Sequence, residues 1–218
     1  MHVISRKTLS DYWQKVPEAE QLLKAWFCEA QKARWTSPAD IKEKYRSASF
    51  LKGNRVVFNI CGNKHRLIVR INYASKTVFV RFVGTHSEYD KINAGSVMSY
   101  NKLIKTEVDY NNALKRIEQL FDAEEGTPEA DELELLATLV ELYEKEHFPI
   151  DAPDPVSAIK FRMEQEGLTN EDMIAYLGGK SRVSEIFSHK RNLSLSMIRK
   201  LVTGLQIPAE VLLGAAVL

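Results

Sequence analysis

Strand-forming patterns are confined to one stretch of the chain, residues 55–83. Three segments rich in Val, Ile, Phe and Tyr, at 55–61, 64–73 and 76–83, are separated by short polar turns. They predict a three-strand antiparallel meander. The apolar residues of 9–30 recur at helical spacing instead, and predict helices before the sheet. The pattern is typical of an α+β domain of about a hundred residues.

The second half of the chain carries helical patterns throughout. Asp109 is expected to cap a helix that runs to about residue 123, and Thr127 and Pro128 are expected to begin another. The proline-containing segment 149–155 then interrupts the chain. Five short helices are predicted after it, at 156–166, 170–177, 181–188, 194–203 and 208–213. The sequence therefore predicts an all-α second part.

The two parts carry opposite charge. Residues 1–97 contain 17 Lys and Arg against 8 Asp and Glu, whereas residues 98–218 contain 13 against 21. The acidic excess lies in residues 98–150, with 13 acidic against 5 basic side chains. Opposite charges attract, so we expect the acidic helices to bind the basic domain.

The sign of the charge changes at a small, polar segment, Asn93-Ala94-Gly95-Ser96, whose composition is typical of a linker. We therefore divide the chain into four regions. They are a basic α+β domain (1–92), a linker (93–101), an acidic helical segment (102–150) and a second helical domain (151–218).

Composition argues against several classes of protein. Cys28 and Cys61 are the two cysteines, and their spacing suits neither a zinc site nor a disulfide framework, so no metal or cofactor is expected. The chain has no run of about 18 apolar residues, and no apolar segment follows the first basic residues. We expect a cytoplasmic protein with no membrane partner.

Basic side chains gather on the predicted sheet. Arg66 and Arg70 alternate with apolar residues along one strand and share a face, which Arg81 joins from the next strand. Metal-free RNA cleavage needs a base for the 2′-hydroxyl, cations for the charge on phosphorus and an acid for the leaving 5′-oxygen. Arginines suit the second task, and His86 or Tyr89 suits the others. Basic residues are also common on ordinary surfaces, so composition leaves both interpretations open.

Three segments of this domain, 62–67, 80–83 and 85–90, resemble the HigB-type toxins of the RelE-like group of mRNA interferases. The sharpest match is Thr-His-Ser-Glu-Tyr-Asp at 85–90. The resemblance implies a RelE-like fold and cleavage of messenger RNA on the ribosome. By matched position, Arg66 and Arg81 would stabilise phosphate charge, and His86 and Tyr89 would transfer protons or stack on bases. Additional RNA-binding residues would be Lys64, Arg70 and Lys91.

The short helices predicted at residues 156–213, and the turns between them, are typical of a DNA-binding domain. Val183, Ile186 and Phe187 are expected to face the core, which leaves polar groups on the exposed side of a slim helix suited to the major groove. The segments 168–178, 181–186 and 190–194 resemble the lambda-repressor-like helix-turn-helix family, although the turn after Gly178 is one residue shorter than usual. The predicted DNA-binding residues are Lys180, Ser181, Arg182, Ser184, Glu185, His189, Lys190 and Arg191.

The second half as a whole resembles the HigA-type antitoxins, so the chain resembles a toxin joined to its antitoxin. This implies that the antitoxin part silences the toxin and represses its own operon by binding operator DNA, as a homodimer that reads two half-sites. One alternative is a transcriptional regulator whose toxin-like domain is inactive. Another is an RNA-binding module that does not cleave.

Overall fold

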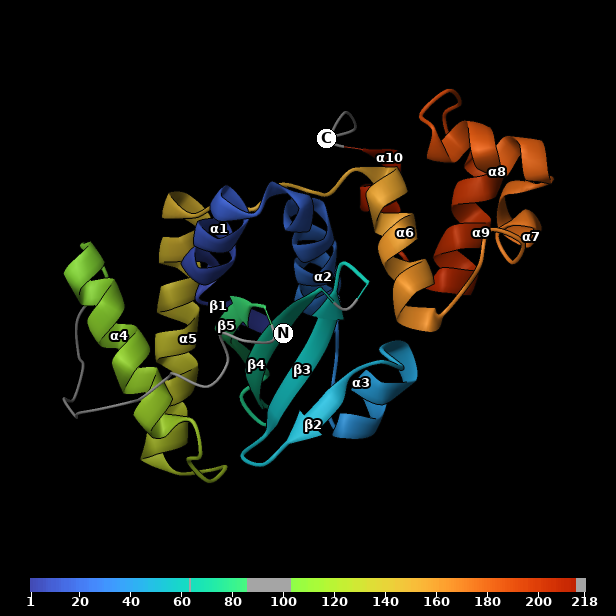
Figure 1. The fold of residues 1–218 in the computed structure, drawn as a ribbon. Helices are drawn as coiled ribbons and strands as arrows, with labels where there is room; N and C mark the ends of the chain where they lie inside the picture. The colour runs from blue at the N-terminus through green and yellow to red at the C-terminus, as the bar shows by residue number, and fades with distance from the viewer. Residues whose placement is uncertain (63, 86–102, 215–218) are drawn as a thin grey trace.

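The computed structural model describes residues 1–62, 64–85 and 103–214 (Figure 1). The predicted linker at 93–101 lies outside these ranges. Within them, no helix is both long and apolar enough to cross a membrane.

One mixed sheet of five strands forms the centre of the first part, in the order β1-β5-β4-β3-β2. Strands β3 (Arg55–Ile60), β4 (His65–Asn72) and β5 (Thr77–Gly84) form the predicted antiparallel meander. The expectation of a three-strand sheet is wrong, because β1 (His2–Ile4) adds to β5 in parallel and β2 (Ser49–Leu51) adds to β3. Each added strand has three residues, too few to show an alternating pattern.

Helices cover one face of this sheet. They are α1 (Arg6–Lys15), the 3-10 turn η1 (Pro17–Ala19), α2 (Glu20–Lys32) and α3 (Pro38–Lys44). Trp26 of α2 packs on Phe58 of β3 at 5.5 Å between ring centroids, and both are fully buried. We call this the inner face of the sheet; its apolar side chains alternate along β3 and β4, as a half-buried strand requires.

A helical hairpin, α4 (Glu107–Leu120) and α5 (Pro128–His147), packs on the opposite face, which we call the outer face. Ile4 and Phe79 of the sheet share a buried cluster with Tyr110, Ile117 and other apolar residues of the hairpin. Thr127 caps α5 as predicted. Asp109 does not cap α4: Thr106 does, and Asp109 lies three residues later and accepts the Thr106 backbone N–H.

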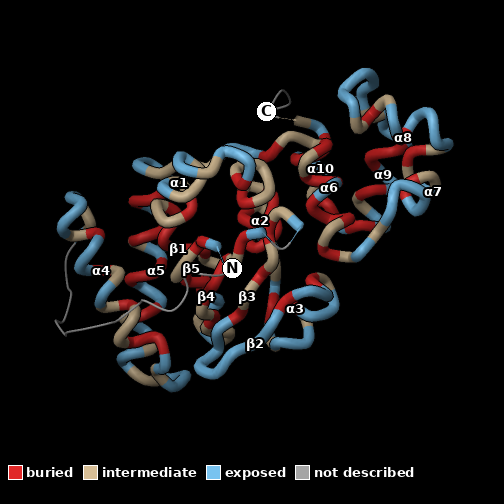
Figure 2. Tube along the Cα trace, in the orientation of Figure 1, coloured by how far each residue is buried: buried red, intermediate tan, exposed pale blue. Residues whose placement is uncertain are grey.

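Five helices follow within the described residues 155–214: α6 (Pro155–Glu166), α7 (Ile174–Leu177), α8 (Lys180–Phe187), α9 (Leu195–Leu205) and α10 (Ala209–Leu213). Helix α7 is shorter than expected, because the chain forms turns at 170–173. The sheet, α6 and α9 each carry buried residues (red in Figure 2), and the side chains of these residues belong to one core cluster. The first part therefore lies between the α4–α5 hairpin and the C-terminal helices (Figure 1).

A buried ionic cluster fastens α6 to α2 and α3. Arg162 lies 3.3 Å from Glu29 of α2, and its guanidinium also donates to the Lys44 carbonyl at 2.9 Å. Tyr45 donates to the same Glu29 carboxylate at 2.8 Å. Gln165 adds a bond of 2.9 Å to the Asn59 carbonyl of β3. Polar groups buried together in this way hold the C-terminal helices in a fixed position on the first part.

Candidate functional site

Two predicted arginines lie on the outer face of the sheet. Arg66 and Arg70 are separated by four residues on β4, so their side chains project from the same side. In the register, Arg66 faces Asn59 of β3, and Arg70 faces Phe79 of β5. Since directly opposed residues share a face, Asn59 and Phe79 also belong to the outer surface.

Arg81 reaches this face through a β-bulge. The pairing of β4 with β5 passes from Ile68–Phe82 to Val69–Val80, which places Arg81 as the extra residue of the bulge. Its guanidinium lies 4.9 Å from the ring centroid of Phe79, on the outer face. A bulge of this kind re-aims a side chain and is common beside active sites. The structure therefore brings Arg66, Arg70 and Arg81 to one surface.

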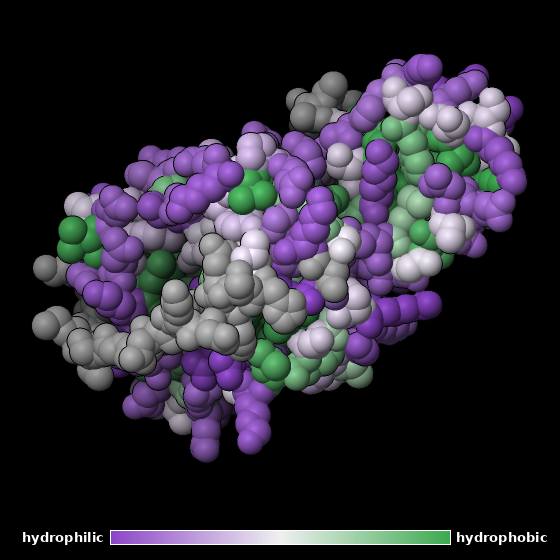
Figure 3. Space-filling model, in the orientation of Figure 1, coloured by the Kyte–Doolittle hydropathy of each residue, from purple (hydrophilic) through white to green (hydrophobic). Residues whose placement is uncertain are grey.

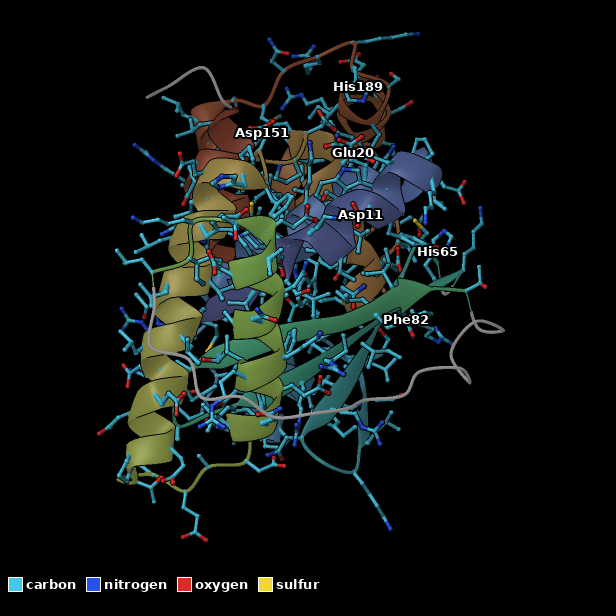
Figure 4. All side chains as sticks on the ribbon, turned by 90° about the vertical axis from the view of Figure 1, so that its left-hand side faces the viewer. Asp11, Glu20, His65, Phe82, Asp151 and His189 are labelled. Carbon is cyan, nitrogen blue, oxygen red and sulfur yellow. The ribbon has the colours of Figure 1, made fainter. Side chains whose placement is uncertain are left out.

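Acidic side chains at the end of α4 contact two of these arginines. Glu118 accepts from Arg81 at 2.6 Å, and Asp122, just beyond the helix, pairs with Arg70. The ring of Phe121, between these acids, lies under the Arg70 guanidinium at 5.0 Å and packs on Phe79 at 6.0 Å between centroids. Figure 4 looks onto α4, which crosses in front of the strands, whereas Phe82 of the outer face lies to one side of the helix.

Arg66 is held within the sheet. Its guanidinium donates to the Asn59 side chain of the adjacent strand. Asn59 in turn donates to the Ser47 carbonyl at 3.4 Å. These contacts orient the Arg66 guanidinium along the sheet.

Lys64 does not join the arginines. It lies in the turn before β4, where its ammonium is 3.8 Å from Glu18 of η1. His65 follows on the inner face, buried, and binds the Tyr12 hydroxyl at 2.8 Å through Nδ1. The remaining predicted residues of the toxin-like site, His86, Tyr89 and Lys91, lie outside the described residues.

A second contact of the hairpin is buried and polar. The Arg6 backbone N–H and the Tyr110 hydroxyl both donate to Glu144 Oε1, at 2.9 and 2.6 Å. The Arg6 guanidinium lies 3.6 Å from Glu144 and 3.5 Å from Glu141. Burial raises the pKa of Glu144 to about 7, against the opposing effect of these donors. The hairpin is thus joined to α1 by a titratable group.

In the C-terminal helices, α8 exposes the predicted polar set. Val183 and Ile186 are buried, and Phe187 is half-buried. Lys180 pairs with Glu171 at 2.8 Å, and Arg191 pairs with Glu185 at 2.5 Å, which holds the pKa of Glu185 below its usual value. The surface of these helices also shows apolar side chains between α6 and α8 (Figure 3). The predicted residues that lie exposed are Lys180, Ser181, Arg182, Ser184, His189, Lys190 and Arg191.

The sequence pointed to an acidic hairpin in general, but not to Glu118, Phe121 and Asp122 in particular. Their spacing of three and four residues is a signal that a helix presents them together, although it is shared by many surface residues. Among the described residues, no three His, Cys, Asp or Glu side chains group as a metal site requires.

Comparison with known proteins covers the first part of the chain. Residues 19–92 match the HigB_toxin family, described as the RelE-like toxic component of a toxin-antitoxin system. The mRNA interferase toxin HigB of Escherichia coli K12 is 31% identical over 96 residues, which are 43% of this chain and 92% of that protein. A similar mRNA interferase HigB of Escherichia coli O6:H1 is 26% identical over 94 residues, 42% of this chain and 91% of its own length.

The matched residues 19–92 contain α2, α3 and strands β2 to β5, and the HigB relatives align over nearly their whole length. The bulged arginine and the basic outer face lie within the matched region. Through its first part, the chain belongs to the HigB family of RelE-like toxins.

Proposed function

We propose that this chain is a self-neutralised ribonuclease that also regulates transcription. Residues 1–92 would cleave messenger RNA on the ribosome, as the names of the mRNA interferase relatives suggest. Residues 102–150 would act as the neutralising part, joined by a linker at 93–101. Residues 151–218 would bind operator DNA as a dimer, in the manner of a HigA-type antitoxin.

The observation that carries the ribonuclease proposal is the arginine-bearing outer face and its acidic cover. Arg81 and Arg70 point outward beside an aromatic ring, and α4 places a carboxylate on each of them. Cations placed in this way suit the charge that develops on phosphorus when the RNA 2′-hydroxyl attacks it. Arg66 would supply a third cation. His86 and Tyr89 would accept and donate the protons, which completes the roles that metal-free cleavage requires.

The neutralising role follows from the same contacts. A tether as short as residues 93–101 keeps the hairpin at an effective concentration on the order of mM, so even a modest intrinsic affinity keeps the face covered. The first part could then cleave RNA only after residues 98–218 are removed.

The test compares residues 1–97 expressed alone with the same region co-expressed with residues 98–218. This region contains residues 19–92, which match the toxin family, and the alignments with the relatives span 96 and 94 residues, which supports its use as a separate protein. We expect new messenger RNA ends with residues 1–97, none when residues 98–218 are present, and none with Arg81→Ala. Lys52→Ala, a change at an exposed turn on the same region, is the matched control.

Other outcomes of this test would favour one of the two alternative functions. Harmless expression with intact messenger RNA would contradict the nuclease and favour a regulator with an inactive first part. Retention of RNA without new ends would favour a binding module.

DNA binding is the second component of the proposal. Helix α8 follows α7 after two glycines, and buries Val183 and Ile186 while its opposite side is polar and exposed. A slim helix of this kind suits the major groove, with Arg182, Ser181 and Ser184 available for base edges. Lys190 and Arg191 lie just after the helix, where phosphates would pass. Specific retardation of DNA from upstream of its own gene, lost with Arg182→Ala, is the expected result.

A further inference from the structure

The groups that residues 118–122 place on the sheet follow the same order as the chemical groups along a strand of RNA. A carboxylate lies on Arg81, an aromatic ring lies on Phe79, and a second carboxylate lies on Arg70. In a strand of RNA the corresponding order is phosphate, base, phosphate. Glu118 lies in the last turn of α4 and Asp122 lies two residues beyond its end, so both carboxylates come from one short segment.

We propose that Glu118, Phe121 and Asp122 occupy subsites for single-stranded RNA. In this assignment Arg81 and Arg70 bind two neighbouring phosphates, and Phe79 stacks on the base between them. The inference rests on the proposed function, since it requires that the outer face binds RNA. It adds Phe79 to the RNA-contacting residues and explains how α4 excludes the substrate.

The environment of Phe79 supports its assignment. The ring is 5% exposed, and its cover is Phe121 of the hairpin, at 6.0 Å between centroids. Without the hairpin this ring would lie on the open face of a sheet, next to the Arg81 guanidinium at 4.9 Å. Aromatic rings flanked by arginines on a sheet are the usual platform for unstacked bases, because every base has a π-face.

The two acidic contacts differ in strength. The side chains of Arg81 and Glu118 are 24% and 32% exposed, whereas Asp122 is 71% exposed. Water screens an exposed ion pair, so Glu118 excludes RNA more strongly than Asp122 does. Phe121 is buried and contributes through apolar contact. Arg66 donates to Asn59 within the sheet. The proposed RNA subsites therefore lie on the part of the outer face that carries Arg70 and Arg81.

The experiment uses the full chain and a fluorescent oligoribonucleotide whose 2′-hydroxyls are methylated, so that it binds without being cleaved. We compare E118Q/D122N with E124Q/E125Q, which removes the same charge from exposed residues just beyond the contact. We expect E118Q/D122N to bind the oligonucleotide about tenfold more tightly than the unsubstituted chain, and the control to match the unsubstituted chain. Glu118→Gln alone should give most of the gain.

Two further substitutions, made in the E118Q/D122N chain, test the subsites. Replacing both Arg70 and Arg81 by Ala should make the slope of log K against log salt shallower by about 1.4, because each single-strand phosphate contact contributes about 0.7. Phe79→Leu keeps the apolar contact with the hairpin but removes the flat ring, and should weaken binding about fivefold or more.

The outcomes separate this inference from the proposed function. Suppose that E118Q/D122N binds no better than its control, while residues 1–97 bind the oligonucleotide through Arg81. The inference that Glu118, Phe121 and Asp122 occupy RNA subsites is then overturned, and the ribonuclease proposal stands. If neither E118Q/D122N nor residues 1–97 binds it, the inference is overturned, and if residues 1–97 also give no new messenger RNA ends, the ribonuclease proposal is overturned with it.

Discussion

Arg81 owes its direction to a single extra residue in β5, and its chemistry to the shape of its guanidinium. The planar group presents several N–H donors in a fixed fork and lies against the Phe79 ring, which a lysine ammonium cannot reproduce. A cation alone would preserve charge at this position but lose the paired hydrogen bonds to phosphate.

We therefore predict that Arg81→Lys lowers the rate of RNA cleavage by residues 1–97 at least tenfold. Arg46→Lys, an exposed residue after α3, should leave the rate unchanged. Rates are measured by the appearance of new RNA ends in purified reactions. Equal rates for Arg81→Lys and the unsubstituted region would show that charge alone suffices.

Glu144 makes the contact of the hairpin sensitive to pH. The side chain is fully buried, and burial raises its pKa from 4.5 to about 7. Below pH 4.5 the carboxyl is protonated in both the folded and unfolded states. As pH rises toward 7, the unfolded state ionises first, so the free energy of unfolding falls, by at most about 3 kcal/mol.

We predict that this decline between pH 5 and pH 7.5 is absent in Glu144→Gln, since the glutamine side-chain oxygen accepts from the Tyr110 hydroxyl and the Arg6 backbone N–H without ionising. Urea unfolding at the two pH values measures it. Glu146→Gln, an exposed neighbour, should keep the decline of the unsubstituted chain. A decline that persists in Glu144→Gln would show that Glu144 is not the group whose titration causes it.

At the level of elements, α4 depends on its first turn. Thr106 accepts the Asp109 N–H at 3.1 Å, and Asp109 accepts the Thr106 N–H at 3.1 Å. This reciprocal pair satisfies two backbone donors that a helix otherwise leaves open. We predict that Thr106→Ala lowers the free energy of unfolding by about 1 kcal/mol. Thr138→Ala, within α5, should change it by less than about half as much, and similar losses for both in urea unfolding would contradict the capping role.

The cluster that joins α6 to α2 is a second element-scale feature. Arg162 is 1% exposed, and its removal would leave the buried Glu29 carboxylate short of a cation. We predict that Arg162→Ala costs about 3 kcal/mol in the free energy of unfolding, because it breaks a buried ion pair and leaves the partly exposed Lys44, at 3.6 Å, as the cation beside Glu29. Arg199→Ala, on the exposed side of α9, should cost less than about 0.5 kcal/mol. A cost below about 1 kcal/mol for Arg162→Ala would contradict the fastening role.

The sequence predicted those elements whose patterns are long. Strands β3, β4 and β5 have six to eight residues rich in Val, Ile and Phe, so their positions and antiparallel order could be predicted. Strands β1 and β2 have three residues each, and they form because an existing sheet edge offers partners. Local propensity cannot show such tertiary effects.

The candidate site was predicted to a similar extent. Period-two alternation placed Arg66 and Arg70 on one face, which the register confirms. Alternation alone could not position Arg81, because the bulge shifts the count by one residue. Nor could it identify Glu118, Phe121 and Asp122, whose contacts depend on where the hairpin docks rather than on spacing within α4.

Across the whole molecule, the two proposed activities occupy opposite sides. The α4–α5 hairpin covers the outer face of the sheet, and α8 lies among the C-terminal helices at the other end (Figure 1). Both the hairpin and α6 are joined to the first part by buried polar contacts. Operator binding therefore does not require the outer face to be uncovered, and the neutralised chain is the form that we expect to bind DNA.

This arrangement leads to a prediction about DNA affinity. Residues 151–218 carry 8 basic and 8 acidic side chains, so few phosphate contacts are available and each should be measurable. We predict that Lys190→Ala weakens binding to operator and to unrelated DNA alike, and makes the salt slope shallower by about 0.9 for each domain that contacts the DNA. Arg182→Ala should instead lower affinity for the operator by about 1–3 kcal/mol and leave unrelated DNA nearly unaffected, since base contacts carry the specificity.

Retardation of labelled DNA at several salt concentrations measures both effects, with Lys15→Ala on α1 as the control for a change in net charge. An equal effect of Lys15→Ala and Lys190→Ala would mean that overall charge, rather than α8 and its flank, determines affinity. The same samples should show no RNA cleavage with or without operator, because DNA contacts on α8 leave Glu118 on Arg81. Cleavage that appears when operator is added would instead show that DNA binding moves the hairpin.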